Sequence, residues 1–359
     1  MSIPPWQPPT RPRTLRIRCI PPHVTQDELR VYLKELLGYD GFILSLFPSK
    51  RDAIATITLT EGEPPTFSEC SPGTRIYLSY PETVAGLVVD CDFLGITPLY
   101  SAQMPVVGII AVTGLADHAY ESWKPRHQPK MWLRDFLPSE IGEHIRILTF
   151  GYDTSRRDDR DAPTIHTFAT SLLKSVAGAR TGDNERNRPL IFIGHSLGGL
   201  VIKQAIAHAS GPEGRDTDKV ILSSCVGIFF FGVPSRGLDL RRLRTLVREP
   251  KHADYIYNLS EDSDFLRFTC DDFLRAVEVH LGGCQIVSFF ETRDTRAVGV
   301  HPDGSWTRSG AMIRAVPEAS ATFGPRPHGV MHKYVAIAAD HSTMVKFAHN
   351  SDPHYTIVR

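Results

Sequence analysis

A serine with one glycine two residues before it and another two residues after it has the spacing to act as a nucleophile. This serine is Ser196, in the pattern Gly194-x-Ser196-x-Gly198. An apolar run, 190–193, precedes the pattern, and apolar residues at helical spacing follow it. The pattern therefore predicts a sharp turn from a strand into a helix, which lifts the serine hydroxyl clear of its neighbours. Glycines are needed where a Cβ would collide with such a turn.

The glycine–serine pattern alone is weak evidence, because it arises by chance in roughly one chain of this length in eight. The alternative is an ordinary glycine-rich turn between a strand and a helix. The context favours a nucleophile, since neither the apolar run before Ser196 nor the helical pattern after it contains a proline.

A serine hydroxyl needs a base within hydrogen-bond reach, and the base needs an acid to orient it. His341 follows the last predicted strand and Glu291 follows an earlier one, so the chain order is serine, acid, histidine. Two other acids could orient an imidazole: Asp294 lies in the same loop as Glu291, and Asp239 follows the preceding strand. We expect Glu291, because it directly ends a strand. Since the chain has 15 histidines, a surface histidine is the alternative interpretation of His341.

Two backbone N–H groups could hold the oxyanion of a tetrahedral intermediate. The first belongs to Leu197, at the start of the helix after Ser196, where the helix dipole also favours negative charge. The second belongs to Leu115, in the loop 113–120 that follows another apolar run. Asp117 in the same loop would place a carboxylate near the developing negative charge.

Segments with strand patterns alternate with segments with helix patterns through residues 94–359. Strands are predicted at 106–112, 145–152, 190–194, 226–232, 285–290 and 334–337. Helices are predicted at 131–137, 164–176, 197–209 and 265–281. The alternation predicts an α/β domain with a mostly parallel sheet and helices on both faces. A Gly/Pro-rich region, 298–330, is expected to be irregular.

Residues 13–93 carry a separate and smaller pattern, which follows a proline-rich stretch, 1–12, that we expect to be a disordered leader. Thr25, with Glu28 three residues later, predicts a capped helix in this segment. The strands are predicted at 15–20, 42–47, 53–59 and 86–93. Residues 94–100 would link this part to the rest of the domain at 94–359.

The order of these elements resembles a small α+β domain of the RNA-recognition-motif kind. Arg16 stands where the first strand would carry a base-stacking aromatic residue, and the third strand has no aromatic residue either. Because bases cannot stack on such a sheet, we expect a docking domain and no nucleic-acid partner.

The composition excludes several classes of protein. With 42% apolar residues the chain can bury a large core, and its formal net charge of zero gives no attraction for nucleic acid or anionic membranes. No apolar run approaches the ~20 residues that cross a bilayer. Six scattered cysteines without a CxxC motif indicate reduced thiols in an intracellular protein. The proline-rich start has no apolar region typical of a secretory signal. A mitochondrial presequence is an open alternative, because four arginines precede the first acid, Asp27, but the prolines disfavour the amphipathic helix that it needs.

Three motifs in chain order resemble the serine-active-site lipase-like family of α/β-hydrolases. They are similar especially to the α/β-hydrolase domains at the N-termini of fungal NACHT, ankyrin or TPR signalling proteins. The motifs are Gly194-His195-Ser196-Leu197-Gly198-Gly199-Leu200, Gly227-Ile228-Phe229-Phe230-Phe231-Gly232-Val233-Pro234 and Asp340-His341-Ser342. The resemblance covers roughly residues 94–357. It implies an α/β-hydrolase fold with Ser196, Glu291 and His341 as nucleophile, acid and base.

Two segments depart from the pattern of this family. Thr113-Gly114-Leu115-Ala116-Asp117-His118 stands where the family usually has His-Gly-Leu-Gly-Gly-His. Val233-Pro234-Ser235-Arg236-Gly237 stands where it has Thr-Pro-His-Arg-Gly. The first departure changes the flexibility of the loop that would carry Leu115, but a backbone donor survives the replacement of side chains.

We therefore expect a serine hydrolase that cleaves an ester or lipid acyl bond and uses no cofactor and no metal. The alternative is a signalling or scaffold module that keeps the fold but has lost turnover. Asp117 and the small N-terminal domain favour this alternative, whereas the intact order of Ser196, Glu291 and His341 favours the hydrolase. A protein partner could dock on residues 13–93. We expect the protein inside the cell, in the cytoplasm, and the family resemblance also admits association with mitochondria or the endoplasmic reticulum.

Overall fold

The computed structural model describes most of the chain. The described residues are 12–49, 51–60, 62–81, 83–114, 118–142, 144–153, 164–239, 242, 259–261, 263–297, 299–300, 306–307, 310–322 and 331–359. Leu115 and Asp117 lie outside these ranges. A large part of region 298–330 and all of the expected leader but Pro12 also lie outside them.

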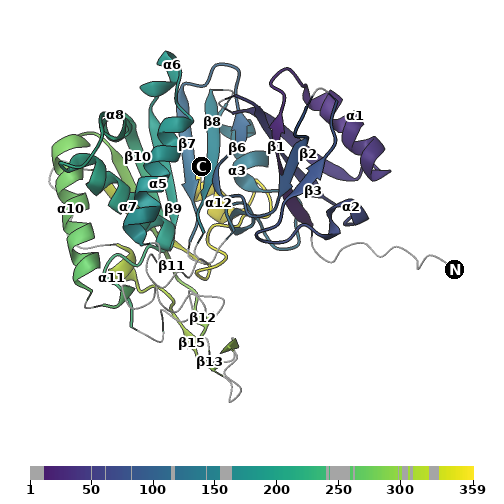
Figure 1. Cartoon of the computed structure of the whole chain (residues 1–359). Helices are drawn as coiled ribbons and strands as arrows, with labels where there is room; N and C mark the ends of the chain where they lie inside the picture. The colour runs from purple at the N-terminus through teal and green to yellow at the C-terminus, as the bar shows by residue number, and fades with distance from the viewer. Residues whose placement is uncertain are drawn as a thin grey trace.

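A seven-stranded sheet forms the centre of the larger unit (Figure 1). Its strands are β6 Gly95–Ser101, β7 Val107–Val112, β8 Ile145–Gly151, β9 Leu190–His195, β10 Cys225–Phe231, β11 Gln285–Glu291 and β16 Met331–Ile337. Their spatial order is β16-β11-β10-β9-β7-β8-β6. Neighbours pair in parallel, except that β6 runs antiparallel to β8. The predicted mostly parallel sheet is therefore confirmed.

Helices cover both faces of this sheet. They are η1 Glu121–Trp123, α3 Trp132–Asp135, α4 Leu137–Ile141, α5 Ile165–Gly178, α6 Asp183–Arg186, α7 Leu197–Ser210, α8 Asp216–Ser224, α10 Asp264–His280, α11 Glu318–Ala321 and α12 Pro353–Val358. Short strands outside the sheet are β12 Thr295–Arg296, β13 Gly299–Val300, β14 Trp306–Thr307 and β15 Met312–Ile313.

Side chains along the strands alternate between two apolar cores, as the period of a strand requires. Phe192 and Phe230 point to one face and pack with α5, α7, α8 and α10. Ile193 and Phe231, their neighbours in sequence, point to the other face and pack with η1, α3, α4 and α12. The sheet is thus buried on both faces, which explains why its strands are apolar runs.

A second, antiparallel sheet of five strands forms the N-terminal unit, in the order β2-β3-β1-β5-β4. Its elements are β1 Arg13–Ile20, α1 Gln26–Leu37, β2 Phe42–Pro48, β3 Ala53–Leu59, α2 Pro65–Ser68, β4 Ile76–Leu78 and β5 Leu87–Asp90. The predicted capping box is present, because Thr25 Oγ1 accepts from the Glu28 backbone N–H and the Glu28 carboxylate accepts from that of Thr25. One face of the sheet packs under α1 in a core of its own, which includes Leu15 and Leu29.

The opposite face of the small sheet is polar and is buried against the larger unit. Thr56 and Thr58 on β3 are fully buried there. Arg134 of α3 donates to the hydroxyl oxygens of both threonines, at 3.2 Å each. Figure 1 shows the small sheet beside β6 and α3.

Arg16 lies on the same polar face. Its guanidinium pairs with Asp90 at 3.0 Å and donates to the Thr97 hydroxyl at 2.8 Å, so it bridges the small sheet and β6. The position at which an RNA-binding sheet would carry an aromatic residue is therefore covered by protein. A base cannot reach this face.

Two cations of the larger unit contact the small one, and each also has a carboxylate nearby in its own unit. Lys124 Nζ donates to the Pro12 carbonyl at 3.0 Å and lies 3.3 Å from Glu121 Oε1. Arg134 pairs with Asp135 at 2.9 Å. The larger unit can therefore neutralise both buried cations without the small sheet.

The prediction of a linker at residues 94–100 was wrong, because all of these residues but Leu94 belong to β6, Gly95–Ser101. Gly95, with a φ of 76°, starts the strand, and Pro98 lies inside it, which weakened the strand pattern in the sequence. β6 is an edge strand, where a proline without an N–H is tolerated. Its register against β8 shifts between Pro98 and Tyr100.

Candidate active site

Ser196 lies between the end of β9 and the start of α7, at the carboxyl end of the parallel sheet. Its φ is 52° and its ψ is −126°, a strained conformation for a residue with a side chain. Its backbone N–H donates to the Phe231 carbonyl at 2.9 Å, which ties it to the end of β10. The chain thus turns from strand to helix within one residue, and the side chain of that residue is the serine hydroxyl.

Gly198 allows α7 to begin directly against the end of β7. A Cβ at this position would lie 2.3 Å from the carbonyl oxygens of both Val112 and Thr113. The Tyr152 hydroxyl donates to the Thr113 carbonyl at 2.8 Å and holds the start of the loop 113–120 in this place. Leu197 is the first residue of α7, so its N–H has no carbonyl one turn earlier to bind.

His341 and Glu291 come from neighbouring parallel strands, since Glu291 ends β11 and His341 follows β16. His341 Nδ1 donates to Glu291 Oε2 at 2.7 Å. The second carboxylate oxygen, Oε1, accepts from the Val316 backbone N–H at 2.9 Å. His341 is 7% exposed and Glu291 is 1% exposed. The acid is therefore held through both of its oxygens, as a carboxylate must be in order to orient an imidazole.

The two alternative acids pair with arginines instead. Asp294 pairs with Arg314 at 3.0 Å near the surface. Asp239 accepts from the Arg242 backbone N–H at 2.8 Å and pairs with its guanidinium at 3.0 Å. The structure brings Glu291 to His341, and brings neither of the other two carboxylates there.

His341 also packs against the residue that precedes the serine. The rings of His195 and His341 lie 4.9 Å apart, and His195 Nε2 donates to the His341 carbonyl at 2.9 Å. His341 Nε2 has no hydrogen-bond partner in the described part of the chain, so it is not bonded to Ser196. Hydrogen bonds between catalytic groups are often long without substrate and shorten when it binds.

Gly232, directly after β10, makes room for the imidazole of His341. Its φ is 54°, and a Cβ there would lie 2.9 Å from His341 Nδ1. Sequence reasoning missed three supports of the site, namely Gly232, His195 and Val316. Gly232 and His195 lie within the motifs quoted above, but Val316 acts through its backbone, so no residue type marks it.

The turn after β16 places His341. Asp340 Oδ1 accepts from the backbone N–H groups of Ser342 and Thr343, at 2.9 and 3.0 Å. Asp340 and Ser342, on either side of His341, both line a cavity of about 850 Å³. Its other charged residues are Glu121, Lys124, Arg126, Asp294, Arg296 and Lys346. The cavity next to the turn that holds His341 is therefore lined by charged side chains of both signs.

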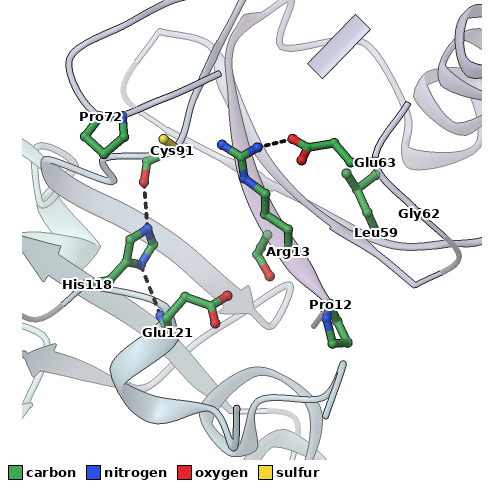
Figure 2. Close-up of a pocket in the computed structure, with 10 residues that line it drawn as sticks. Pro12, Arg13, Leu59, Gly62, Glu63, Pro72, Cys91, His118 and Glu121 are labelled. Atoms are coloured by element: carbon green, nitrogen blue, oxygen red, sulfur yellow. Dashed lines mark hydrogen bonds and ion pairs between the residues drawn. The ribbon is translucent and has the colours of Figure 1, made fainter. Parts of the chain in front are cut away.

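A second cavity, of about 430 Å³, lies between the small sheet and His118, a residue of the segment that follows Leu115 in the chain (Figure 2). His118 Nε2 donates to the Cys91 carbonyl at 2.6 Å, and Nδ1 accepts from the backbone N–H groups of Tyr120 and Glu121. Burial lowers the pKa of His118, which agrees with a neutral ring whose proton is on Nε2. This ring links the small sheet to the segment that follows the loop.

The fold, with a serine at a strand–helix turn and an acid–histidine pair at the same sheet end, is typical of one class of protein. Residues 109–353 match the alpha/beta hydrolase family. Because the match spans more than half of the chain, the chain belongs to the alpha/beta hydrolase family.

Curated relatives share part of this chain. Protein SERAC1 of Homo sapiens is 27% identical over 289 residues, which are 72% of this chain and 40% of the relative. Protein SERAC1 of Mus musculus is 31% identical over 173 residues, which are 46% of this chain and 24% of the relative. The chain thus spans less than half the length of these relatives.

Solved structures with some likeness to this chain have low sequence identity. A lipase-esterase related protein from Clostridium acetobutylicum ATCC 824 is 11% identical, with a TM-score of 0.37, over 70% of this chain and 94% of its own. Phospholipase PlaB from Legionella pneumophila is 14% identical, with a TM-score of 0.38, over 52% of this chain and 39% of its own. Membership of the family therefore rests on the match over residues 109–353.

Proposed function

We propose that the protein is a serine hydrolase that cleaves an ester or lipid acyl bond, with Ser196 as its nucleophile. The observation that carries this proposal is the 2.7 Å hydrogen bond from His341 Nδ1 to Glu291 Oε2, at the sheet end where Ser196 lies. Membership of the alpha/beta hydrolase family supports it.

In the proposed reaction, Ser196 Oγ attacks the acyl carbon while His341 Nε2 takes the hydroxyl proton. Glu291 keeps the proton of the ring on Nδ1 and balances the charge of the imidazolium. The backbone N–H groups of Leu197 and Leu115 hold the oxyanion. His341 then gives its proton to the leaving alcohol, and water releases the acyl group from Ser196 by the same steps.

A panel of p-nitrophenyl esters of increasing acyl length, with one phospholipid, tests this proposal. Wild type should hydrolyse at least one member, and Ser196→Ala should lose at least about 10³-fold of that rate. Ser351→Ala, which changes an exposed serine, is the matched control and should keep full activity. If wild type turns over none of the substrates, the proposal fails and the inactive scaffold module is supported instead.

The location and partners of the protein belong to the same proposal. The six cysteines are free thiols, which supports an intracellular location. Within the described ranges, no helix combines the length and the apolar composition that crossing a membrane requires. Association with mitochondria or the endoplasmic reticulum, the relation to fungal signalling proteins and a partner that docks on residues 13–93 remain predictions. Cell fractionation tests the first of them.

A further inference from the structure

Three metal-ligating side chains meet on the helical face of the larger unit, away from Ser196. His166 lies in the first turn of α5, His208 in the last turn of α7, and Glu213 in the turn that follows α7. One ligand atom of each lies within 4.8 Å of the other two. The two imidazole rings are 5.2 Å apart and nearly perpendicular.

The backbone holds these three positions together. α5 and α7 pack along one another and share an apolar core, which fixes His166 beside His208 (Figure 1). The Gly211 N–H donates to the Ala207 and His208 carbonyls at 3.1 Å, so the turn folds back on the end of α7. Glu213 is thereby kept next to His208.

The three side chains have few other interactions in the described part of the chain. None of them makes a hydrogen bond or a salt bridge there, and the ring contact between the two histidines is their mutual one. The nearby Asp218 interacts electrostatically with His208, but Arg215 binds both of its carboxylate oxygens. The three ligand atoms are therefore available to a cation.

Two imidazole nitrogens and one carboxylate oxygen form the donor set that suits Zn²⁺ and related divalent transition ions. Bonds of 2.0–2.1 Å in a tetrahedral arrangement place ligand atoms about 3.3 Å apart. Small rotations of these half-buried or exposed side chains close the remaining gap from 4.8 Å. We propose that His166, His208 and Glu213 bind a divalent transition-metal ion of the zinc class, with water in the fourth position.

The proposed ion has a structural role. His208 lies twelve residues after Ser196, which directly precedes α7, and this is about 18 Å at the rise of a helix. A metal at this distance cannot touch an acyl group on Ser196. It would cross-link α5 to the end of α7. The proposed metal site is therefore independent of the proposed hydrolase activity.

The test uses the full chain, stripped with a chelator and titrated with ZnCl₂ by calorimetry. We expect one ion per chain and an increase of the Tm when zinc is added. His166→Ala, His208→Ala and Glu213→Gln should each weaken zinc binding at least about ten-fold, the loss that even an outer-shell partner causes. Co²⁺ should give a d–d absorption band in wild type that these variants lose.

Two controls separate this site from zinc bound elsewhere. His280→Ala removes an exposed histidine at the end of α10, and Ser196→Ala removes the proposed nucleophile. Both should bind zinc as wild type does. Zinc binding that is equally strong in wild type and in all three ligand variants would overturn the proposal, and so would no binding up to millimolar zinc.

Discussion

Replacing Glu291 with glutamine changes the one atom that His341 Nδ1 contacts and little else. The Val316 backbone N–H needs an acceptor, so the glutamine oxygen should keep the position of Oε1, 2.9 Å from that nitrogen. The amide NH₂ then faces His341 Nδ1, 2.7 Å away. Because two N–H donors cannot share one hydrogen bond, the imidazole proton must move to Nε2.

With its proton on Nε2, His341 cannot take the proton of Ser196. The same change of tautomer in a serine protease lowers kcat by about 10⁴, so we expect a loss of about 10³ to 10⁴, or about 4–5.5 kcal/mol of transition-state stabilisation. The side chain keeps its size and becomes neutral, so the variant should fold. We expect its circular dichroism to match that of wild type.

The assay is the kcat of the preferred ester for three single variants. Glu291→Gln should show the large loss, whereas Asp294→Asn and Asp239→Asn should stay within about three-fold of wild type, the range of a surface change. Full activity in Glu291→Gln, together with a loss in Asp294→Asn or Asp239→Asn, would refute the choice of acid.

Three further predictions concern the core, the site and the small unit. Burial lowers the pKa of Lys203 from 10.5 to about 8, so the unfolded chain holds this proton more tightly than the folded one. As the pH rises from about 8 to 10.5, the free energy of unfolding of wild type should increase by about 3 kcal/mol relative to that of Lys203→Met. Urea titrations at several pH values measure this difference. A difference that stays constant with pH would contradict the prediction. Gly232→Ala should lower kcat by about 10²-fold, because its Cβ would displace the His341 ring; an unchanged kcat would show that the ring tolerates it. Deleting residues 1–93 should leave a unit that unfolds cooperatively in calorimetry at a lower Tm, since it keeps both of its apolar cores except for the buried Phe93. Aggregation of the truncated protein would show that the two units depend on one another.

Local signals in the sequence predicted local structure well. The turn at Ser196 and the capping box at Thr25 each depend on a few neighbouring residues, and both are present in the structure. The parallel sheet followed from apolar runs, because strands that are buried on both faces need no polar side.

Predictions that depend on partners distant in sequence were less complete. The strand β6 was missed because it contains Pro98, which is tolerated at the edge of the larger sheet. The neighbouring residues in the sequence do not indicate that this strand lies at an edge. α8 was missed because its buried apolar residues are Ile221 and Leu222. Two neighbouring apolar residues do not form the repeating apolar stripe from which a helix is predicted. The sequence left three acids for His341, and the contact with Glu291 appears once β11 and β16 pair in the folded chain.

The most direct test of the account is to treat the full chain with a fluorophosphonate probe and to map the adduct by peptide mass spectrometry. We predict one adduct on wild type, at Ser196, and no adduct on Ser196→Ala. Ser235 is the competing site, since its hydroxyl lies 2.6 Å from Lys203 Nζ, and a lysine can also activate a serine. An adduct at Ser235, or no adduct on wild type, would contradict the claim that Ser196 is an activated nucleophile.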